Sequence, residues 1–153
     1  MSTIGPQIER DQREPFIRQF SVFLPNRVGQ FGELLGTLAE AGVEVLGVSI
    51  VDSSDWAVVR AVFSDPDKAR DALNRHGMAF TECDALGVVL ADAASLQKVC
   101  TALLAAELNV KFAFPLLVQR EGQPVMVLHV DDEVLAVRVL ARHGFHMIGH
   151  EEP

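Results

Sequence analysis

The strongest constraint on the fold of this chain is a short segment that occurs twice. Leu73-Asn74-Arg75-His76-Gly77 and Leu140-Ala141-Arg142-His143-Gly144 are identical at four of five positions and lie 67 residues apart. Each follows an apolar helical pattern, and a glycine at this point is typical of a left-handed helix C-terminus. The repeat predicts two copies of one structural unit within the 153 residues.

The residues around the first copy predict the order of elements in this unit. Alternating or β-branched residues predict strands at about 17–24, 43–51, 56–63 and 78–82. Apolar residues with helical spacing predict a first helix over 31–38. A second helix should begin at Ser64-Asp65-Pro66-Asp67, with a capping side chain and a proline in the first turn. The order is β-α-β-β-α-β.

The second half repeats this order. Strands are predicted at 86–90, 110–118, 125–130 and 145–148, and helices at 96–104 and from Asp131 onward. We therefore expect an α+β fold of two tandem ferredoxin-like units, each with both helices on one face of an antiparallel four-stranded sheet. The predicted domains are a flexible N-terminal tail (1–15), a first unit (16–83) and a second unit (84–153).

Composition limits the partners of the chain. Hydrophobic residues make up 49% of it, which is enough for a substantial core. A formal charge of −8 argues against nucleic acid or an anionic membrane surface as the main partner. There is no signal-peptide pattern and no apolar run of the roughly 20 residues that span a bilayer. We expect a cytoplasmic protein in which Cys83 and Cys100 are reduced packing residues rather than a disulfide.

Several predicted strands are apolar on both faces, as in Val58-Val59 and Ala61-Val62-Phe63. The helices of a ferredoxin-like unit cover only one face of its sheet. Either the sister unit or a second chain must then cover the other face. We expect a homodimer.

The turn between the first strand and the first helix has the residues of a binding loop. Pro25 ends the strand, Asn26 can cap a helix or bind a ligand, and Gly29 allows a tight turn or the close approach of a second body. The free amides of the following helix point back into this turn and could hold a carboxylate. Arg27 could meet a ligand carboxylate through its forked donors, but an arginine in a surface loop is more often simply solvated.

Three segments of the first half together resemble a known family. The turn Leu24–Phe31, the helix exit Leu38–Val43 and the segment Trp56–Ala69, which includes Arg60, resemble the ACT domain, in particular the stand-alone tandem ACT proteins. The resemblance implies binding of a free amino acid or related metabolite at an interface between units. It places the ligand-binding residues at Asn26, Arg27, Val28, Gly29, Gln30 and Phe31. The matching loop of the second half, Leu90–Ser95, is one residue shorter and has no glycine, so we expect the ligand at the first loop.

The sequence does not predict a metal, cofactor or catalytic site. His146 and His150 share a face of the predicted final strand but lie about 13 Å apart at ~3.3 Å per residue, so no metal site is expected near them and His143. His143 and His76 suit the negative ends of their helices. No cofactor is expected, and we find no phosphate loop, nucleophile elbow or cysteine in an electropositive setting.

The leading hypothesis is a non-catalytic regulatory module that senses a small molecule and acts on a partner enzyme. One alternative is a protein-interaction subunit whose ligand site is vestigial. Another is an acylphosphatase-like hydrolase, because Asn26-Arg27-Val28-Gly29 distantly resembles a loop that cradles phosphate.

Overall fold

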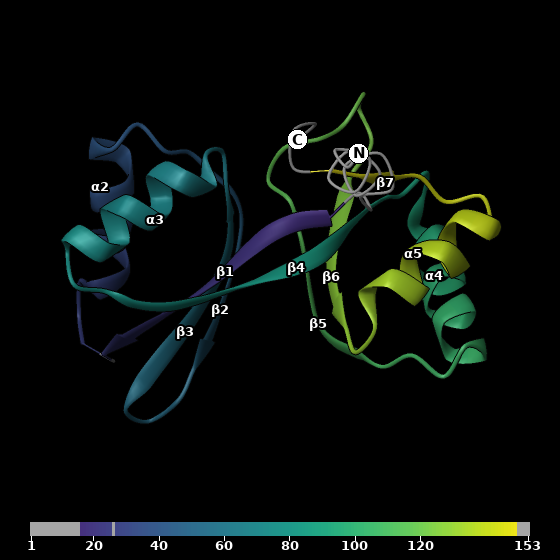
Figure 1. The fold of residues 1–153 in the computed structure, drawn as a ribbon, viewed down its shortest axis with the longest axis horizontal. Coiled ribbons are helices and arrows are strands. Elements are labelled where there is room, and N and C mark those ends of the chain that lie inside the picture. The colour runs from purple at the N-terminus through teal and green to yellow at the C-terminus, as the bar shows by residue number, and fades with distance from the viewer. Residues whose placement is uncertain (1–15, 26, 150–153) are drawn as a thin grey trace, which may run out of the picture.

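The computed structural model describes residues 16–25 and 27–149. The predicted tail 1–15, Asn26 and residues 150–153, which include His150, lie outside the described residues. The first unit contains β1 (Phe16–Pro25), α2 (Gln30–Glu40), β2 (Val45–Asp52), β3 (Trp56–Phe63) and α3 (Pro66–Arg75). The strand β4 (Ala79–Val89) follows, and then α4 (Ala93–Ala105), β5 (Val110–Pro115), β6 (Val125–Val130), α5 (Glu133–Arg142) and β7 (Met147–Ile148) (Figure 1).

The predicted α+β fold of two β-α-β-β-α-β units is confirmed, and their sheets are joined. All the strands belong to one antiparallel sheet with the order β2-β3-β1-β4-β6-β5, while β7 also pairs with β4. In the first unit β4 is the last strand, next to β1. In the second unit β4 is the first strand, between β6 and β7. A single strand therefore serves both units.

Each half of β4 pairs with a different unit. Residues Ala79 to Leu86 lie opposite β1, and Leu86 to Val89 lie opposite β6. The predicted domain boundary at 83/84 falls inside this strand. At the junction, a Cβ on Gly87 would overlap Cδ1 of the buried Ile17 and lie 3.0 Å from Cγ1 of Ile148, so a larger residue would force these core side chains to shift.

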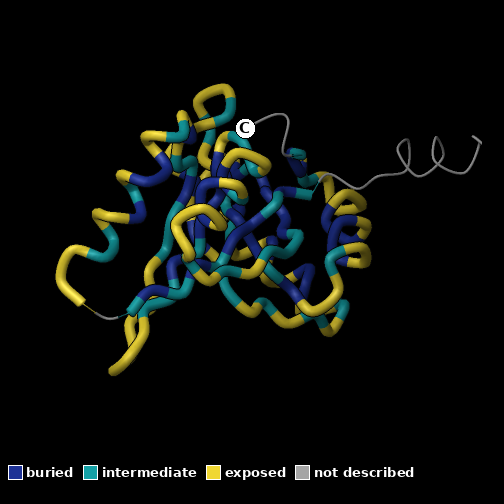
Figure 2. The backbone as a smooth tube through the Cα atoms, turned by 60° about the vertical axis from the view of Figure 1, so that its left-hand side comes forward, coloured by how far each residue is buried: buried dark blue, intermediate teal, exposed yellow. Residues whose placement is uncertain are grey.

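The core has three parts. One cluster lies under α2 and α3 and another under α4 and α5, and Figure 1 shows these helix pairs at opposite ends of the molecule with the strands between them. The third cluster lies on the helix-free face, where the two units meet: Ile17, Val62, Ala85, Phe114, Leu116, Val125, Val127 and Ile148. Burial is concentrated in these central strands (Figure 2). The sister unit thus covers part of the face that the sequence predicted to need a cover.

The sheet curls until its two edges touch. The backbone N–H of Leu117 donates to Leu46 O at 2.6 Å, and Gly47 forms an isolated bridge with Leu116. A Cβ on Gly47 would lie 2.7 Å from Leu116 Cδ2 and 3.3 Å from Leu116 Cα, so a larger residue here would force the Leu116 side chain to shift. Contact between β2 and the segment after β5 fixes the relative position of the units.

The predicted ends of α3 are confirmed. Asp65 is the N-cap and accepts a hydrogen bond from Lys68 N at 3.1 Å, and Pro66 occupies the first turn. Gly77 follows the helix with φ of 68°, the left-handed conformation that terminates helices.

Parts of the prediction for the second half are wrong. Cys100 is exposed and Leu104 is 75% exposed, so neither belongs to the buried side of α4. That side is formed by Ser95, Val99, Ala102 and Leu103. The strand predicted to reach residue 118 ends at Pro115, and β7 has only two residues. Both cysteines are free thiols. No helix among the described residues is long and apolar enough to cross a membrane.

Candidate functional site

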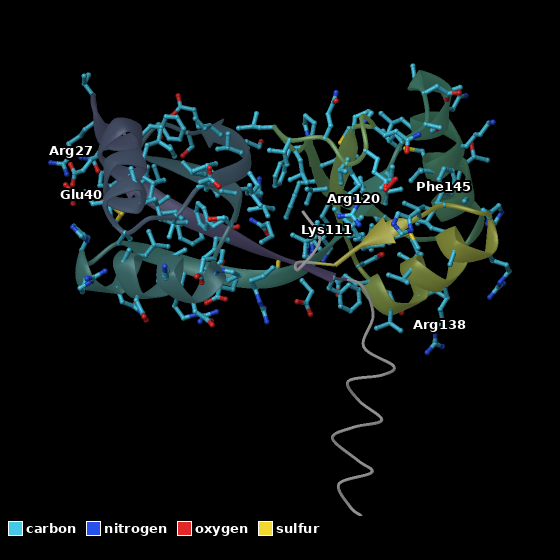
Figure 3. All side chains as sticks on the ribbon, turned by 90° about the horizontal axis from the view of Figure 1, so that it is seen from above. Arg27, Glu40, Lys111, Arg120, Arg138 and Phe145 are labelled. Atoms are coloured by element: carbon cyan, nitrogen blue, oxygen red, sulfur yellow. The ribbon has the colours of Figure 1, made fainter. Side chains whose placement is uncertain are left out.

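The predicted binding loop forms one wall of a small pocket at the outer end of the first unit. The pocket has a volume of about 220 Å³. Its lining comes from the β1–α2 turn and the facing ends of β2 and β3: Leu24, Pro25, Arg27, Gln30, Phe31, Ile50, Asp52, Ala57 and Val59. Figure 3 shows Arg27 at this end, far from Phe145 and Arg138 of the second unit.

Only some of the predicted site residues line the pocket. Arg27, Gln30 and Phe31 line the pocket. Gly29 is the N-cap of α2, and Val28 is fully exposed beside it. Sequence reasoning did not anticipate the contribution of β2 and β3, because it treated the loop as an isolated motif.

The N-terminus of α2 is open. Gly29 has φ of 88°, which favours glycine, and no side chain caps the helix there. Asp65, Asp92 and Asp132 cap the other helices of the described ranges through their side chains. First-turn amides have no intrahelical acceptor and carry the positive end of the helix dipole. The end of α2 next to the pocket can therefore accept an anion.

The pocket combines both charges with an apolar floor. Arg27 and Asp52 are exposed residues of opposite charge, from the β1–α2 turn and from the end of β2. Leu24 and Val59 are almost fully buried beneath them. Such a lining fits a small zwitterion that carries an apolar group.

The equivalent helix start in the second unit is closed by its own residues. Ser95 N donates to Asp92 Oδ1 at 2.9 Å, and Asp92 N donates to Ser95 Oγ at 3.4 Å, which together form a capping box. The Asp92 carboxylate thus occupies the place that an anionic ligand would take.

These two helix starts follow the first strand of their units, and a known family shares this architecture. A family model described as an ACT domain pair matches residues 16–152. The chain belongs to the ACT domain pair family. The resemblance stated from the sequence is thereby confirmed, and the two units are ACT units.

Solved structures share the fold. The protein BT0572 from Bacteroides thetaiotaomicron superposes with a TM-score of 0.83 at 22% identity, covering 91% of this chain and 96% of that one. The ligand-free regulatory subunit of aspartate kinase from Thermus thermophilus gives 0.59 at 17% identity, covering 84% and 93%. The corresponding Thermus flavus subunit gives 0.57 at 18% identity with the same coverage. A comparison with curated proteins gives no match.

Each ACT unit also has a larger groove beside its helices. The groove of the first unit has about 450 Å³ and charged side chains of both signs, including Glu40, Lys68 and Asp71. The groove of the second unit has about 440 Å³ and lies between α4 and the residues His143 and Phe145. Neither was expected from the sequence, because the residues that line them form no distinctive motif.

A polar cluster on the helix-free face was also missed. Gln19 is completely buried, and its Oε1 accepts a hydrogen bond from Cys83 Sγ at 2.9 Å. Burial, with smaller effects from Glu133 and Asp84, raises the pKa of Cys83 to about 11, so its thiol is neutral at pH 7. No group of three or more metal-ligating side chains occurs within the part of the chain that the structure describes.

Proposed function

We propose that this protein is a non-catalytic regulatory module that binds a free amino acid or related small metabolite in the pocket at residues 26–31. The observation that carries the proposal is the uncapped start of α2 beside a pocket that contains Arg27 and Asp52. The known regulatory role of an aspartate kinase subunit with this fold supports it by analogy alone.

The ligand would be held at both charged ends. Its carboxylate would meet the open amides of α2 and the guanidinium of Arg27. Its ammonium group would face Asp52, and its side chain would lie against Phe31 and Ile50. A volume of about 220 Å³ restricts the occupant to a small molecule.

A second copy of the chain would complete the site. Val28, Ile50, Val51 and Trp56 are exposed apolar residues at the same end of the first unit. The exposed tip of the β2–β3 hairpin projects there in Figure 2. A homodimer formed at this end would bury the apolar rim and cover the ligand, and would pass the binding signal to a partner enzyme.

A thermal-shift panel of the twenty amino acids and several biosynthetic end products tests the proposal. A ligand at about a hundred times its Kd adds roughly 2.7 kcal/mol of stability, which raises the Tm by roughly 5–10 °C in a chain of this size. The shift should disappear in Asp52→Asn and in Asn26→Ala. It should persist in Asp55→Asn, a matched control in the same hairpin turn. Absence of any shift at millimolar ligand would refute the proposal.

The exposed apolar rim also favours the second candidate, an interaction subunit with a vestigial ligand site. This candidate predicts that Gly29→Asp, which places a carboxylate at the open helix start, leaves binding to a partner enzyme intact. The sensor proposal predicts instead that Gly29→Asp abolishes any ligand-dependent change in partner binding. A titration of the partner against wild type and variant, with and without ligand, separates the two.

A further inference from the structure

We propose that Arg60 and a row of hydroxyl groups on the helix-free face of the first ACT unit form a second binding site, which takes a small oxyanion. This site is distinct from the pocket at residues 26–31. That pocket lies at the helix-covered side, where Leu24 and Val59 belong to the core under α2 and α3. Arg60 lies next to Val59 in the strand and points to the opposite face.

Strand register places the hydroxyl groups beside Arg60. In the sheet, Arg60 of β3 is the direct partner of both Ser21 of β1 and Ser49 of β2. Ser21 is in turn the partner of Thr81 of β4. Direct cross-strand partners share a face of the sheet. Ser49, Arg60, Ser21 and Thr81 therefore form one polar row across four strands.

The Arg60 side chain is held in position without a carboxylate. Its Cζ atom lies 4.3 Å from the ring centroid of Phe112, and this ring stacks on His129 with centroids 4.9 Å apart. The Nε atom is buried and has no hydrogen-bond partner. No ion pair joins Arg60 to an Asp or Glu within 16–25 and 27–149.

The absence of such an ion pair in this range is informative because the chain has an excess of acidic residues. Arg18 pairs with Glu82 and Asp84, and Arg70 pairs with Glu82 and Asp67. The buried Nε is out of reach of a ligand, whereas the terminal Nη groups of this half-buried side chain are donors that an anion could reach. We infer that this donor set is reserved for a ligand.

The hydroxyl group of Ser21 is oriented to assist. Its Oγ accepts a hydrogen bond from Gln19 Nε2 at 3.2 Å. Gln19 is itself fixed by complete burial and by the Cys83 thiol. With an acceptor lone pair of Ser21 occupied, its O–H can donate to an anion bound at Arg60.

The next row along the same face is apolar and only partly covered. Phe23 and Val58 are direct partners, as are Val58 and Val51. Phe23 and Val58 are half-buried and Val51 is 48% exposed. An oxyanion that carries an apolar group would cover this row, so a small apolar carboxylate fits better than inorganic phosphate.

Two-dimensional ¹H–¹⁵N NMR titrations test the site with probes that lack the ammonium group of an amino acid. The probes are 4-methylvalerate, inorganic phosphate and the uncharged 4-methylvaleramide. We expect saturable shifts in the middle of β1 and β3 with 4-methylvalerate, weaker ones with phosphate and none with the amide. Binding of phosphate alone would still support an oxyanion site and would assign it to phosphate ligands. No saturable shift with either anion would overturn the proposal.

Variants locate the binding. Arg60→Met keeps the alkyl stem over Phe112 but removes the charge and the unsatisfied Nε, so it should weaken carboxylate binding by about tenfold or more. Its Tm without ligand should equal or exceed that of wild type, which shows that the fold is intact. Ser21→Ala should weaken binding by a smaller factor. The exposed control Arg75→Met and the pocket variant Asp52→Asn should bind as wild type does. Retained binding in Arg60→Met would overturn the proposal.

The proposals for the two sites can be refuted independently. The pocket at 26–31 requires an ammonium group and Asp52, whereas the site at Arg60 requires neither. An amino acid that stabilises the protein through Asp52, with no response to either 4-methylvalerate or phosphate, would leave the proposed function standing and remove the second site.

Discussion

The two ACT units share one architecture down to individual hydrogen bonds. At the end of α3, His76 Nδ1 lies 3.0 Å from Ala72 O, and at the end of α5, His143 Nδ1 lies 2.8 Å from Val139 O. A left-handed glycine follows each histidine. Each of these carbonyls also accepts the backbone N–H of the same histidine, at 3.1 and 3.2 Å, so the imidazole adds a second contact at the helix end. The repeated His-Gly pair is therefore explained by helix termination.

The units differ at the start of their first helices. Gly29 leaves α2 open beside a pocket, whereas Asp92 and Ser95 close α4. The hairpin strands of the first unit have eight residues each and those of the second unit have six. A few loop residues thus separate a unit with an open helix start beside a pocket from one whose helix start is closed by its own side chains.

The helices are also docked differently. In the first unit Arg70 of α3 donates from Nε and Nη2 to the two carboxylate oxygens of Glu82 on β4, at 2.6 and 2.8 Å. The residue of α5 that lies 67 positions after Arg70 is the buried Val137. The first unit holds its second helix partly by charge, and the second unit does so by apolar packing.

The largest effect should come from truncating the equivalent core leucines. Leu73 and Leu140 are both fully buried. Leu73→Ala and Leu140→Ala should each lower the free energy of unfolding by about 2–5 kcal/mol, because each leaves a cavity. Urea unfolding followed by far-UV circular dichroism and by the fluorescence of Trp56, the only tryptophan, measures this.

The same experiment tests whether the units are coupled. Trp56 lies in the first unit. Leu140→Ala lies in the second unit, but β4 is common to both units. The variant should therefore shift the urea midpoint reported by Trp56 fluorescence by as much as the midpoint reported by circular dichroism. If the Trp56 midpoint stayed at its wild-type value, the units would unfold independently and the shared strand would not couple them.

A smaller effect is expected from the cap that distinguishes the helix starts. Asp92→Ala removes the acceptor for Ser95 N and should destabilise the protein by about 1 kcal/mol. Asp92→Asn retains an acceptor oxygen and should cost less. Comparison of the two Tm values measures the cap. Equal decreases in Tm in both variants would show that the carboxylate charge, rather than the hydrogen bond, stabilises α4.

The smallest effect concerns the ion pair of the first unit. The hydrogen bonds from Arg70 lower the pKa of Glu82 below its usual 4.5. The ion pair therefore contributes stability above that value, and the contribution is lost as the pH falls through the lower folded pKa. Glu82→Gln should cost less than about 1 kcal/mol at pH 7, since Arg70 is partly exposed.

The measurement is urea unfolding of wild type and Glu82→Gln at pH 7 and at successively lower pH. The difference in free energy of unfolding between wild type and Glu82→Gln should shrink in acid and in high salt. A difference that grows in acid would contradict the proposed charge effect.

Local rules accounted for most elements, and the predicted site residues account for three of the nine residues that line the candidate pocket. Periodicity located the helices, and Asp65, Pro66 and Gly77 marked the ends of α3, because these signals act through neighbouring backbone atoms. The same rules failed for Cys100 and Leu104, since helical spacing cannot show how far round a helix the core extends. The resemblance to the ACT family, rather than local rules, pointed to Arg27, and both missed Asp52, which reaches the pocket only through the pairing of β1 with β3 and of β3 with β2.

The sequence by itself determined the family, the repeated β-α-β-β-α-β order and the loss of the glycine in the second loop, because each depends on residues close together in the chain. Tertiary structure decided that β4 belongs to both units and that the sheet closes through Gly47 and Leu116. It also decided that Arg60 lies on the ring of Phe112 and forms no ion pair with a described carboxylate. These features depend on contacts between residues far apart in the chain, which sequence periodicity does not encode.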